Sequence, residues 1–231
     1  TSYTAFKARY AVLGGPNKQM VVGYKSLPDL IERAHRIAYR VTKAEALDLP
    51  EFTDQTRFCQ LEPFAKQFYT SLAKDSVAEL ESGEKITAAN ILVKLLKLQE
   101  ATGGFIKEGG ANCVSRAKIN LLAEILDDII EAGKKVVVFA RFRAEIQAIM
   151  ELLDAMKIGY TVIYGDVPIS ERGARVNEFQ RNPKCKVFVA QIQTAGLGIT
   201  LTAADTAVFY SLDFSFANYD QCRARIHRIG Q

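Results

Sequence analysis

The second half of the chain alternates short apolar runs with amphipathic segments, and this alternation restricts its fold more than any other feature. The run KVVVFA at 135–140 is apolar almost throughout, which is typical of a parallel strand buried on both faces. Apolar patterning predicts further strands at 160–164, 186–190 and 206–210, and helices at 115–131, 143–157, 170–181 and 216–229. We therefore expect an α/β fold, with an open, mainly parallel sheet covered by helices on both faces.

The preceding 112 residues lack this alternation. YAVLGGPNKQMVVGY, within residues 1–26, contains glycines and a proline and is predicted to form a loop or short strands. A helix is predicted at 27–39, a strand at 54–63, and longer helices at 63–81 and 86–99. A mostly helical segment is therefore expected before the sheet.

Composition excludes several classes of protein. A chain of 231 residues with 48% hydrophobic and 24% charged residues is expected to be globular rather than disordered. No apolar run is long enough to cross a bilayer and no signal peptide opens the sequence, so we expect an intracellular protein with no membrane partner. The formal charge of +4 permits nucleic-acid binding without demonstrating it. The cysteines are scattered at positions 59, 113, 185 and 222, so no metal site is expected.

Three loops are expected to meet at one edge of the sheet, because right-handed crossovers bring the ends of parallel strands together. In FARFRAE, Arg141 and Arg143 lie at a strand-to-helix turn, where they either bind phosphate or form a solvated turn. In YGDVPISER, Gly165 allows close backbone approach, although a plain turn before a capped helix explains it equally well.

The third loop, QIQTAGLGITLTAAD, connects the last two predicted strands. It is too polar and too rich in glycine for a loop that only connects two strands. Gly196 and Gly198 free the backbone to approach an anion, while Gln191, Gln193 and Thr194 supply hydrogen-bonding side chains. A G-x-G pattern alone is a weak signal, and it gains weight from its place at the sheet edge.

The chain ends on QCRARIHRIGQ, its densest polar cluster. At 3.6 residues per turn, Gln221, Arg225 and Arg228 lie close to one face of a helix. Two guanidinium groups on one face can bind the same polyanion. A solvated basic helix end explains this helix equally well when it is taken alone. His227 is expected to pack or hydrogen-bond rather than act as a base.

Taken together, VVVFARF, YGD…SERGARVNEFQ, QTAGLGITLTAADTAVFY and QCRARIHRIGQ resemble the motifs of the second RecA-like lobe of Swi/Snf-type ATPases, a branch of the superfamily two helicases. R-x-H-R-x-G-Q is the most specific match and GLGITLTAAD is the next. Upstream, YRVTKAEALDLPEF is similar to the family's segment between the lobes, and TAANILVKLLKLQEATGGF to its helical region. The resemblance implies three parts: the end of the first lobe with the linker (1–50), a helical extension packed on the second lobe (51–112), and that lobe (113–231).

The sequence departs from the family pattern at three places. Ala224 stands where an acidic residue is common, and Phe214-Ser215-Phe216-Ala217 replaces a frequent Trp-Asn-Pro element. These changes put the local hydrogen bonding in doubt, not the roles of the arginines. QIQTA lacks the arginine seen in many chromatin remodellers, which favours a bacterial or phage-like origin, and so a cytoplasmic over a nuclear location.

The resemblance implies half of an active site. No G-x-x-x-x-G-K-[ST] loop and no acidic strand end for magnesium occur in the sequence, and in the family both belong to the first lobe. We therefore expect a longer parent protein in which the first lobe holds most of ATP and Mg²⁺. This chain alone is expected to bind neither and to be inactive, its end marking where the lobe is cut.

By resemblance, the parent is an ATP-dependent translocase on double-stranded DNA. Arg228 is expected to be the arginine finger, Arg225 a second γ-phosphate contact and Gln221 their orienting residue, beside Gly196 and Gly198. The expected DNA contacts, mostly to phosphates, come from the side of the sheet edge and involve Arg141, Gly165, Gln193 and Thr194. Two alternatives stay open: an RNA-directed helicase of the same superfamily, and a non-enzymatic doubly wound module that binds an anion or a protein.

Overall fold

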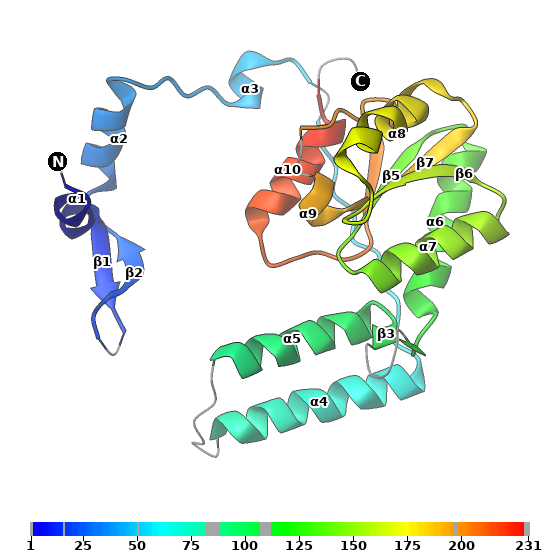
Figure 1. The fold of residues 1–231 in the computed structure, drawn as a ribbon, viewed down its shortest axis with the longest axis horizontal. Coiled ribbons are helices and arrows are strands. Elements are labelled where there is room, and N and C mark those ends of the chain that lie inside the picture. The colour runs from blue at the N-terminus through cyan, green and yellow to red at the C-terminus, as the bar shows by residue number, and fades with distance from the viewer. Residues whose placement is uncertain are drawn as a thin grey trace. The chain divides into compact units, whose positions relative to one another are not determined.

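The computed structural model describes residues 2–15, 17–49, 51–81, 88–106, 112–195 and 198–228. The chain divides into two compact units, Thr1–Asp48 and Leu49–Gln231 (Figure 1).

The first unit holds a hairpin between short helices. The Tyr10 hydroxyl donates to Asp29 Oδ2 (2.6 Å) and Arg9 Nη2 to Asp29 Oδ1 (3.0 Å), which ties the first helix to the second. Short strands are therefore present where the sequence predicted a loop or short strands, and the first helix was not predicted. The helix predicted at 27–39 ends at His35. The elements are α1 (Tyr3–Tyr10), β1 (Ala11–Gly14), β2 (Met20–Tyr24), α2 (Leu27–His35) and α3 (Lys43–Ala46).

The second unit is built on a four-stranded sheet in which every neighbouring pair is parallel, in the order β6-β7-β5-β8. The central strand β5 is buried at all five positions, as its unbroken apolar run predicted. The predicted α/β fold with a mainly parallel sheet is confirmed (Figure 1). The strands are β5 (Val136–Ala140), β6 (Gly159–Ile163), β7 (Cys185–Gln191) and β8 (Thr206–Phe209).

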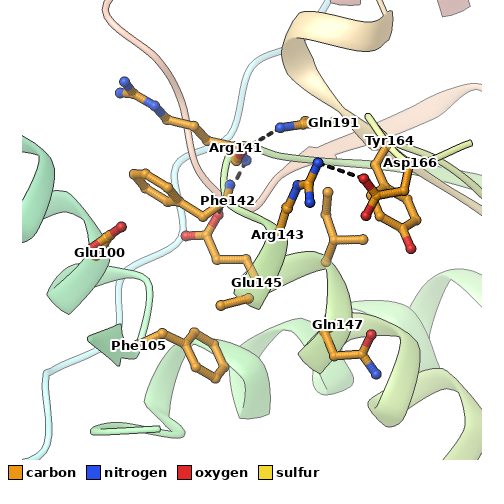
Figure 2. Close-up of a pocket in the computed structure, with 12 residues that line it drawn as sticks. Glu100, Phe105, Arg141, Phe142, Arg143, Glu145, Gln147, Tyr164, Asp166 and Gln191 are labelled. Carbon is orange, nitrogen blue, oxygen red and sulfur yellow. Dashed lines mark hydrogen bonds and ion pairs between the residues drawn. The ribbon is translucent and has the colours of Figure 1, made fainter. Parts of the chain in front are cut away.

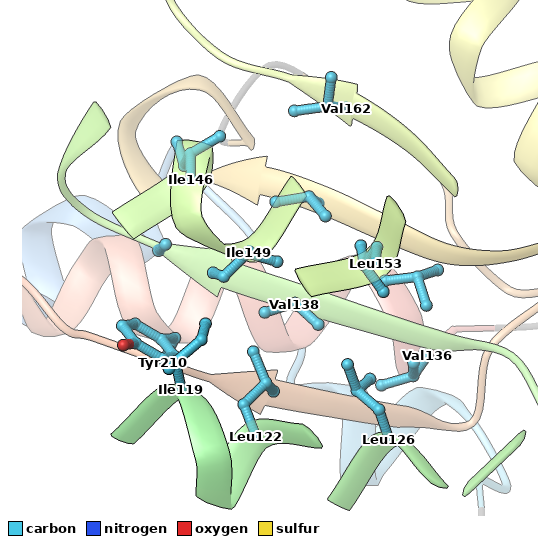
Figure 3. Packing of buried hydrophobic residues seen from close by; sticks show 13 residues of the cluster. Ile119, Leu122, Leu126, Val136, Val138, Ile146, Ile149, Leu153, Val162 and Tyr210 are labelled. Atoms are coloured by element: carbon cyan, nitrogen blue, oxygen red, sulfur yellow. The ribbon is translucent and has the colours of Figure 1, made fainter. Parts of the chain in front are cut away.

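Helices cover both faces of the sheet, and each face has its own core. On one face, α6 (Ala117–Glu131) and α7 (Arg143–Ala155) bury aliphatic side chains against alternate residues of β5 (Figure 3). The opposite face packs against α8 (Ile169–Arg181), α9 (Ile192–Ala195) and α10 (Phe216–Ile226). Because both faces of the sheet are packed against helices, the loops that follow the strands lie at the edge of the sheet.

A helical hairpin precedes the sheet, formed by α4 (Pro63–Glu81) and α5 (Ala88–Thr102) and followed by β3 (Phe105–Ile106) and β4 (Asn112–Cys113). Its end is bonded to the sheet region: the buried Tyr210 hydroxyl donates to Gly103 O (3.0 Å). The helix predicted at 63–81 is confirmed, and the one predicted at 86–99 continues to Thr102 before its glycine stop.

Three sequence predictions were wrong. The strand predicted at 54–63 is absent, because residues 51–62 are mostly exposed and pair with no other strand, whereas a ladder needs a partner. The helix predicted at 216–229 ends at Ile226, because the backbone of His227 leaves the helical region at ψ 85°. The loop after β7 was predicted without a helix, yet it opens with the single turn of α9.

No helix within the described ranges combines the length and apolar character needed to span a membrane.

Candidate functional site

Gln191 ties together the carboxyl ends of three strands. Its Oε1 accepts from the Gly165 backbone amide (3.1 Å) and from Thr194 Oγ1 (3.5 Å), while its Nε2 donates to Arg141 O (3.2 Å). A Cβ at Gly165 would lie 3.3 Å from Arg143 Nη2, so glycine suits this crowded position. Three residues predicted from separate loops are thus brought to one place, which we name the carboxyl edge (141–147, 164–168 and 191–195).

A pocket of about 680 Å³ opens at the carboxyl edge. Its walls come from the loop after β5 and the start of α7, the loop after β6, and Gln191 at the end of β7, together with Glu100 of α5 and Phe105 of β3 (Figure 2). Because the helical hairpin closes one side, the pocket is shared between the sheet and the hairpin.

The two arginines of FARFRAE point in different directions. Arg143 forms an ion pair with Asp166 (2.6 Å) beside the pocket, and both side chains are more than half exposed. Arg141 donates to Gln99 of α5, and its guanidinium lies 5.2 Å and 5.5 Å from the ring centres of Phe142 and Phe214. Figure 2 shows that the side chains of Arg141 and Arg143 leave the loop on different sides. Arg143 is therefore the more accessible cation, and Arg141 is held against the hairpin.

A buried carboxylate that the sequence did not single out supports this edge. Glu145 is 1% exposed, and its Oε2 accepts from the backbone amides of Arg141 (3.2 Å) and Phe142 (3.1 Å) and from Ser211 Oγ. Burial raises the pKa of Glu145, an effect opposed by these hydrogen bonds and by the charge of Lys118. The available signal was a glutamate at the third position of a predicted helix, where carboxylates cap free amides.

The arginine-bearing helix α10 is fixed by one face and open on another. Ser215 Oγ accepts from Asn218 N (3.3 Å) at its start, and Cys222 and Ile226 are buried against the sheet. Burial raises the pKa of the Cys222 thiol to about 12, which keeps it protonated and unreactive at neutral pH. Gln221 is exposed and Arg225 half-buried, so both predicted side chains lie outside the core.

The glycine-rich loop and the end of α10 are bonded to one another. The Leu201 amide donates to Arg225 O (2.9 Å), and Arg228 Nη1 donates to Thr200 Oγ1 (3.1 Å). Gly198 adopts φ +70°, a conformation that favours glycine. Arg228 follows the end of the helix instead of lying on it, which corrects the predicted placement of both arginines on one continuous helix. The predicted Gly196 lies outside the described residues.

The short helix α9 connects the predicted residues of the carboxyl edge with those of α10. It carries Gln193, which is exposed, and Thr194, which contacts Gln191. At its start the buried Ile192 accepts from the Cys222 thiol of α10 through its backbone oxygen (3.8 Å). The carboxyl edge and the arginine helix are thus joined through one helical turn.

The described residues suit phosphate better than a metal ion. The exposed Arg228 guanidinium offers charged donors of the kind that bind phosphate oxygens. Within the described ranges, no three His, Cys, Asp or Glu side chains are grouped so that they could hold a metal ion.

Several known proteins resemble this chain in sequence or in fold. Residues 117–230 match the family described as helicase conserved C-terminal domain. The chain is 33% identical over 114 residues to Helicase SWR1 of Yarrowia lipolytica, covering 49% of this chain and 6% of that protein. It is 29% identical over 217 residues to the mouse chromodomain-helicase-DNA-binding protein 1-like, covering 90% of this chain and 24% of the relative.

A solved structure extends the likeness to the whole chain. The Sulfolobus solfataricus SWI2/SNF2 ATPase core in complex with dsDNA matches with a TM-score of 0.66 and 26% identity, covering 100% of this chain and 49% of that one. The chain therefore spans a small part of its curated relatives and about half of this solved core. The matching proteins come from a yeast, a mouse, Sulfolobus and the bacterium Mycoplasma genitalium, so they do not support the predicted bacterial or phage-like origin over another.

Proposed function

We infer the function from the premise that residues 117–230 are a helicase C-terminal domain and that the chain is of the Swi/Snf type. We propose that it is the C-terminal lobe of an ATP-dependent translocase on double-stranded DNA and that it hydrolyses ATP only together with a first lobe. The observation that carries this proposal is the junction of the glycine-rich loop with the arginine helix, through Leu201 N to Arg225 O and Arg228 to Thr200.

In this proposal Arg228 is the arginine finger. Its exposed guanidinium would contact the γ-phosphate and stabilise the charge that develops during phosphoryl transfer, an effect of about 10³–10⁵ in rate for such arginines. Arg225 would make a second contact with the γ-phosphate, and Gln221, one helical turn earlier, would orient both. The glycine-rich loop with Gly196 and Gly198 would let backbone amides approach the nucleotide.

ATP and Mg²⁺ would be held mainly by the first lobe. When bound, the magnesium ion would neutralise charge on the β- and γ-phosphates. The residues of this chain would supply only cationic and amide donors, which is consistent with the arginines at the end of α10. For this reason we propose that the chain alone binds nucleotide weakly or not at all.

The carboxyl edge would contact DNA. Gly165 and Gln193 are exposed there and Thr194 is half-buried. The Gln193 amide would donate to a phosphate directly, whereas the Gly165 N–H and the Thr194 hydroxyl would do so only on leaving Gln191 Oε1. Arg141 would contact the backbone after leaving Gln99 or would support the edge from behind, whereas the exposed Arg143 is an additional cation. Contacts of this kind are independent of base sequence and weaken steeply with salt.

The proposal is tested by ATP hydrolysis of the full-length parent protein with duplex DNA, with RNA of matched length, and with no nucleic acid. We expect stimulation by duplex DNA of unrelated sequences, decreasing as the salt concentration rises. Stimulation by RNA alone would assign the lobe to an RNA-directed helicase. A parent protein that hydrolyses no ATP under any of these conditions would leave the non-enzymatic binding module as the better description.

A further inference from the structure

The arginine helix α10 carries a second polar face that the proposed function does not use. Arg223 and Arg225 are two positions apart, which places their side chains about 200° from each other around the helix. Tyr219 and His227 precede and follow Arg223 by four residues and so share its side. The face with Arg223 therefore looks away from the face with Arg225.

The second face is covered by the start of the second unit, residues 51–62, which we name the linker segment. The Arg223 guanidinium lies 4.2 Å from the ring centre of Phe52, close enough for a strong cation–π contact. Arg223 Nη2 is also 3.4 Å from Asp54 Oδ2. The Arg223 side chain is 26% exposed, compared with 60% for Asp54, so the linker segment shields the arginine from solvent.

The contact extends one turn in each direction along the helix. The Phe52 ring meets the His227 ring edge-on at 5.1 Å, and the Tyr219 hydroxyl donates to Asp54 Oδ1 (3.5 Å). Arg223 is also 5.3 Å from the Tyr219 ring. Phe52 and Asp54 thus contact side chains at positions 219, 223 and 227, which lie about one helical turn apart on the same side.

The position of His227 gives this contact its consequence. The backbone leaves the helix at His227, and Arg228 is the next residue. A His227 ring fixed by Phe52 therefore limits the directions that Arg228 can take. Arg223 accepts the last helical bond through its backbone oxygen, from His227 N (3.1 Å), so the side chain held by the linker segment belongs to the residue that closes the helix.

We propose that Arg223 is a positioning residue, and that Phe52 and Asp54 of the linker segment act through it to set the pose of Arg225 and Arg228. The consequence for ATP hydrolysis rests on the function proposed above. The second unit begins at Leu49, and Phe52 follows three residues later. A displacement of the chain entering this unit would therefore reach the arginine end of α10 directly.

The first test measures the kcat and KM for ATP of the full-length parent protein with duplex DNA. Arg223→Gln and Phe52→Leu should each lower kcat about three- to tenfold with KM within about twofold, the size expected for one cation–π contact. Arg223→Lys and Phe52→Tyr keep the cation and the ring and should restore most of the rate. The matched controls are Phe58→Leu, an exposed ring in the same segment, and Arg181→Gln, an exposed arginine on α8; neither should change kcat.

The second test does not depend on ATP hydrolysis. The 231-residue chain contains no tryptophan, so Phe52→Trp introduces a single fluorescent reporter that preserves the cation–π contact. We expect its emission to be shielded from acrylamide, and the added change Arg223→Gln to increase quenching at least twofold. Thermal unfolding measured alongside shows whether each variant is folded.

The two readouts separate the proposal from the proposed function. Increased quenching together with a lower kcat at unchanged KM supports the positioning role. Increased quenching with unchanged kcat means that the contact exists without positioning the arginines, which overturns the proposal. Unchanged quenching in folded variants overturns it as well, whatever the rate. A wild-type parent without DNA-stimulated hydrolysis overturns the proposed function and the positioning role of Arg223 in it, while the fluorescence still decides whether the contact exists.

Discussion

The carboxyl edge and the arginine end of α10 are held in different ways. At the carboxyl edge, Gln191 joins three loops through its own amide group, and every partner lies within residues 141–194. At the arginine end, Arg223 depends on Phe52 and Asp54, which lie far earlier in the sequence. The difference suggests that the edge is preformed within the lobe, whereas the arginine end takes its pose partly from the chain that enters the lobe.

The largest expected effect is the loss of ATP hydrolysis when this chain is separated from the first lobe. Because the sequence contains no P-loop motif, the isolated chain should not turn over ATP. Phosphate release by the purified 231-residue chain with duplex DNA should equal that of buffer, while the full-length parent is active under the same conditions. Robust turnover by the isolated chain would contradict a half site.

The preformed character of the carboxyl edge is tested by Gln191→Leu. Removing the amide leaves the Gly165 N–H and the Arg141 carbonyl without their partner, and we expect the free energy of unfolding to fall by about 1–3 kcal/mol. Urea denaturation measures this loss. Gln193→Leu, an exposed change two residues later on α9, should cost less than about 0.5 kcal/mol. Equal costs for the two variants would show that Gln191 does not hold the edge.

The contribution of Glu145 to the stability of the carboxyl edge should depend on pH. Because burial raises the pKa of Glu145 above its ordinary value of 4.5, ionisation opposes folding. The stability associated with protonated Glu145 is present below about pH 4.5 and is lost as the pH rises through the pKa in the folded state. Glu145→Gln does not ionise, so its Tm relative to wild type should rise between pH 4.5 and pH 8.

A matched control for this pH series is Glu124→Gln, an exposed change on α6. Its Tm should follow that of wild type across the same range. Lys118 and Tyr210 face Glu145 in the buried cluster and remain unchanged in both variants, so the difference between the series belongs to Glu145. A Tm difference that is constant with pH would contradict an ionised and buried Glu145.

The smallest expected effect concerns the ion pair at the pocket. Arg143 and Asp166 are both more than half exposed, so Asp166→Asn should change the free energy of unfolding by less than about 0.5 kcal/mol. The freed Arg143 should nevertheless strengthen binding of duplex DNA and steepen the salt dependence by about one phosphate contact. Fluorescence anisotropy at several salt concentrations measures both. Asp127→Asn on α6 makes the same charge change elsewhere, and an equal gain from it would contradict a local role.

The periodic part of the fold was predictable from the sequence. The unbroken apolar run of β5 and the spaced apolar residues of α6 both reflect burial that is specified locally. The strand predicted at 54–63 failed for the opposite reason. Its residues favour an extended chain, but a strand also requires a partner, and the linker segment contacts α10 through side chains instead.

The candidate site was predictable only in part. The motifs indicated which loops carry polar residues, and the parallel sheet explains why Arg141, Gly165 and Thr194 meet. The role of Gln191 and the contact of Phe52 with Arg223 depend on tertiary packing between distant segments, which no local pattern encodes. The sequence also did not predict the end of α10 at Ile226, because RARIHR continues a helical pattern through His227.

The central claim is that Arg228 completes an ATP site on a second lobe, and Arg228→Ala in the full-length parent tests it most directly. Steady-state ATP hydrolysis with saturating duplex DNA should fall by about 10³-fold or more, while circular dichroism, Tm and DNA binding remain those of wild type. Arg181→Ala, an exposed arginine on α8, serves as the control and should keep the full rate. A folded, DNA-binding Arg228→Ala protein that hydrolyses ATP at the wild-type rate would contradict the claim.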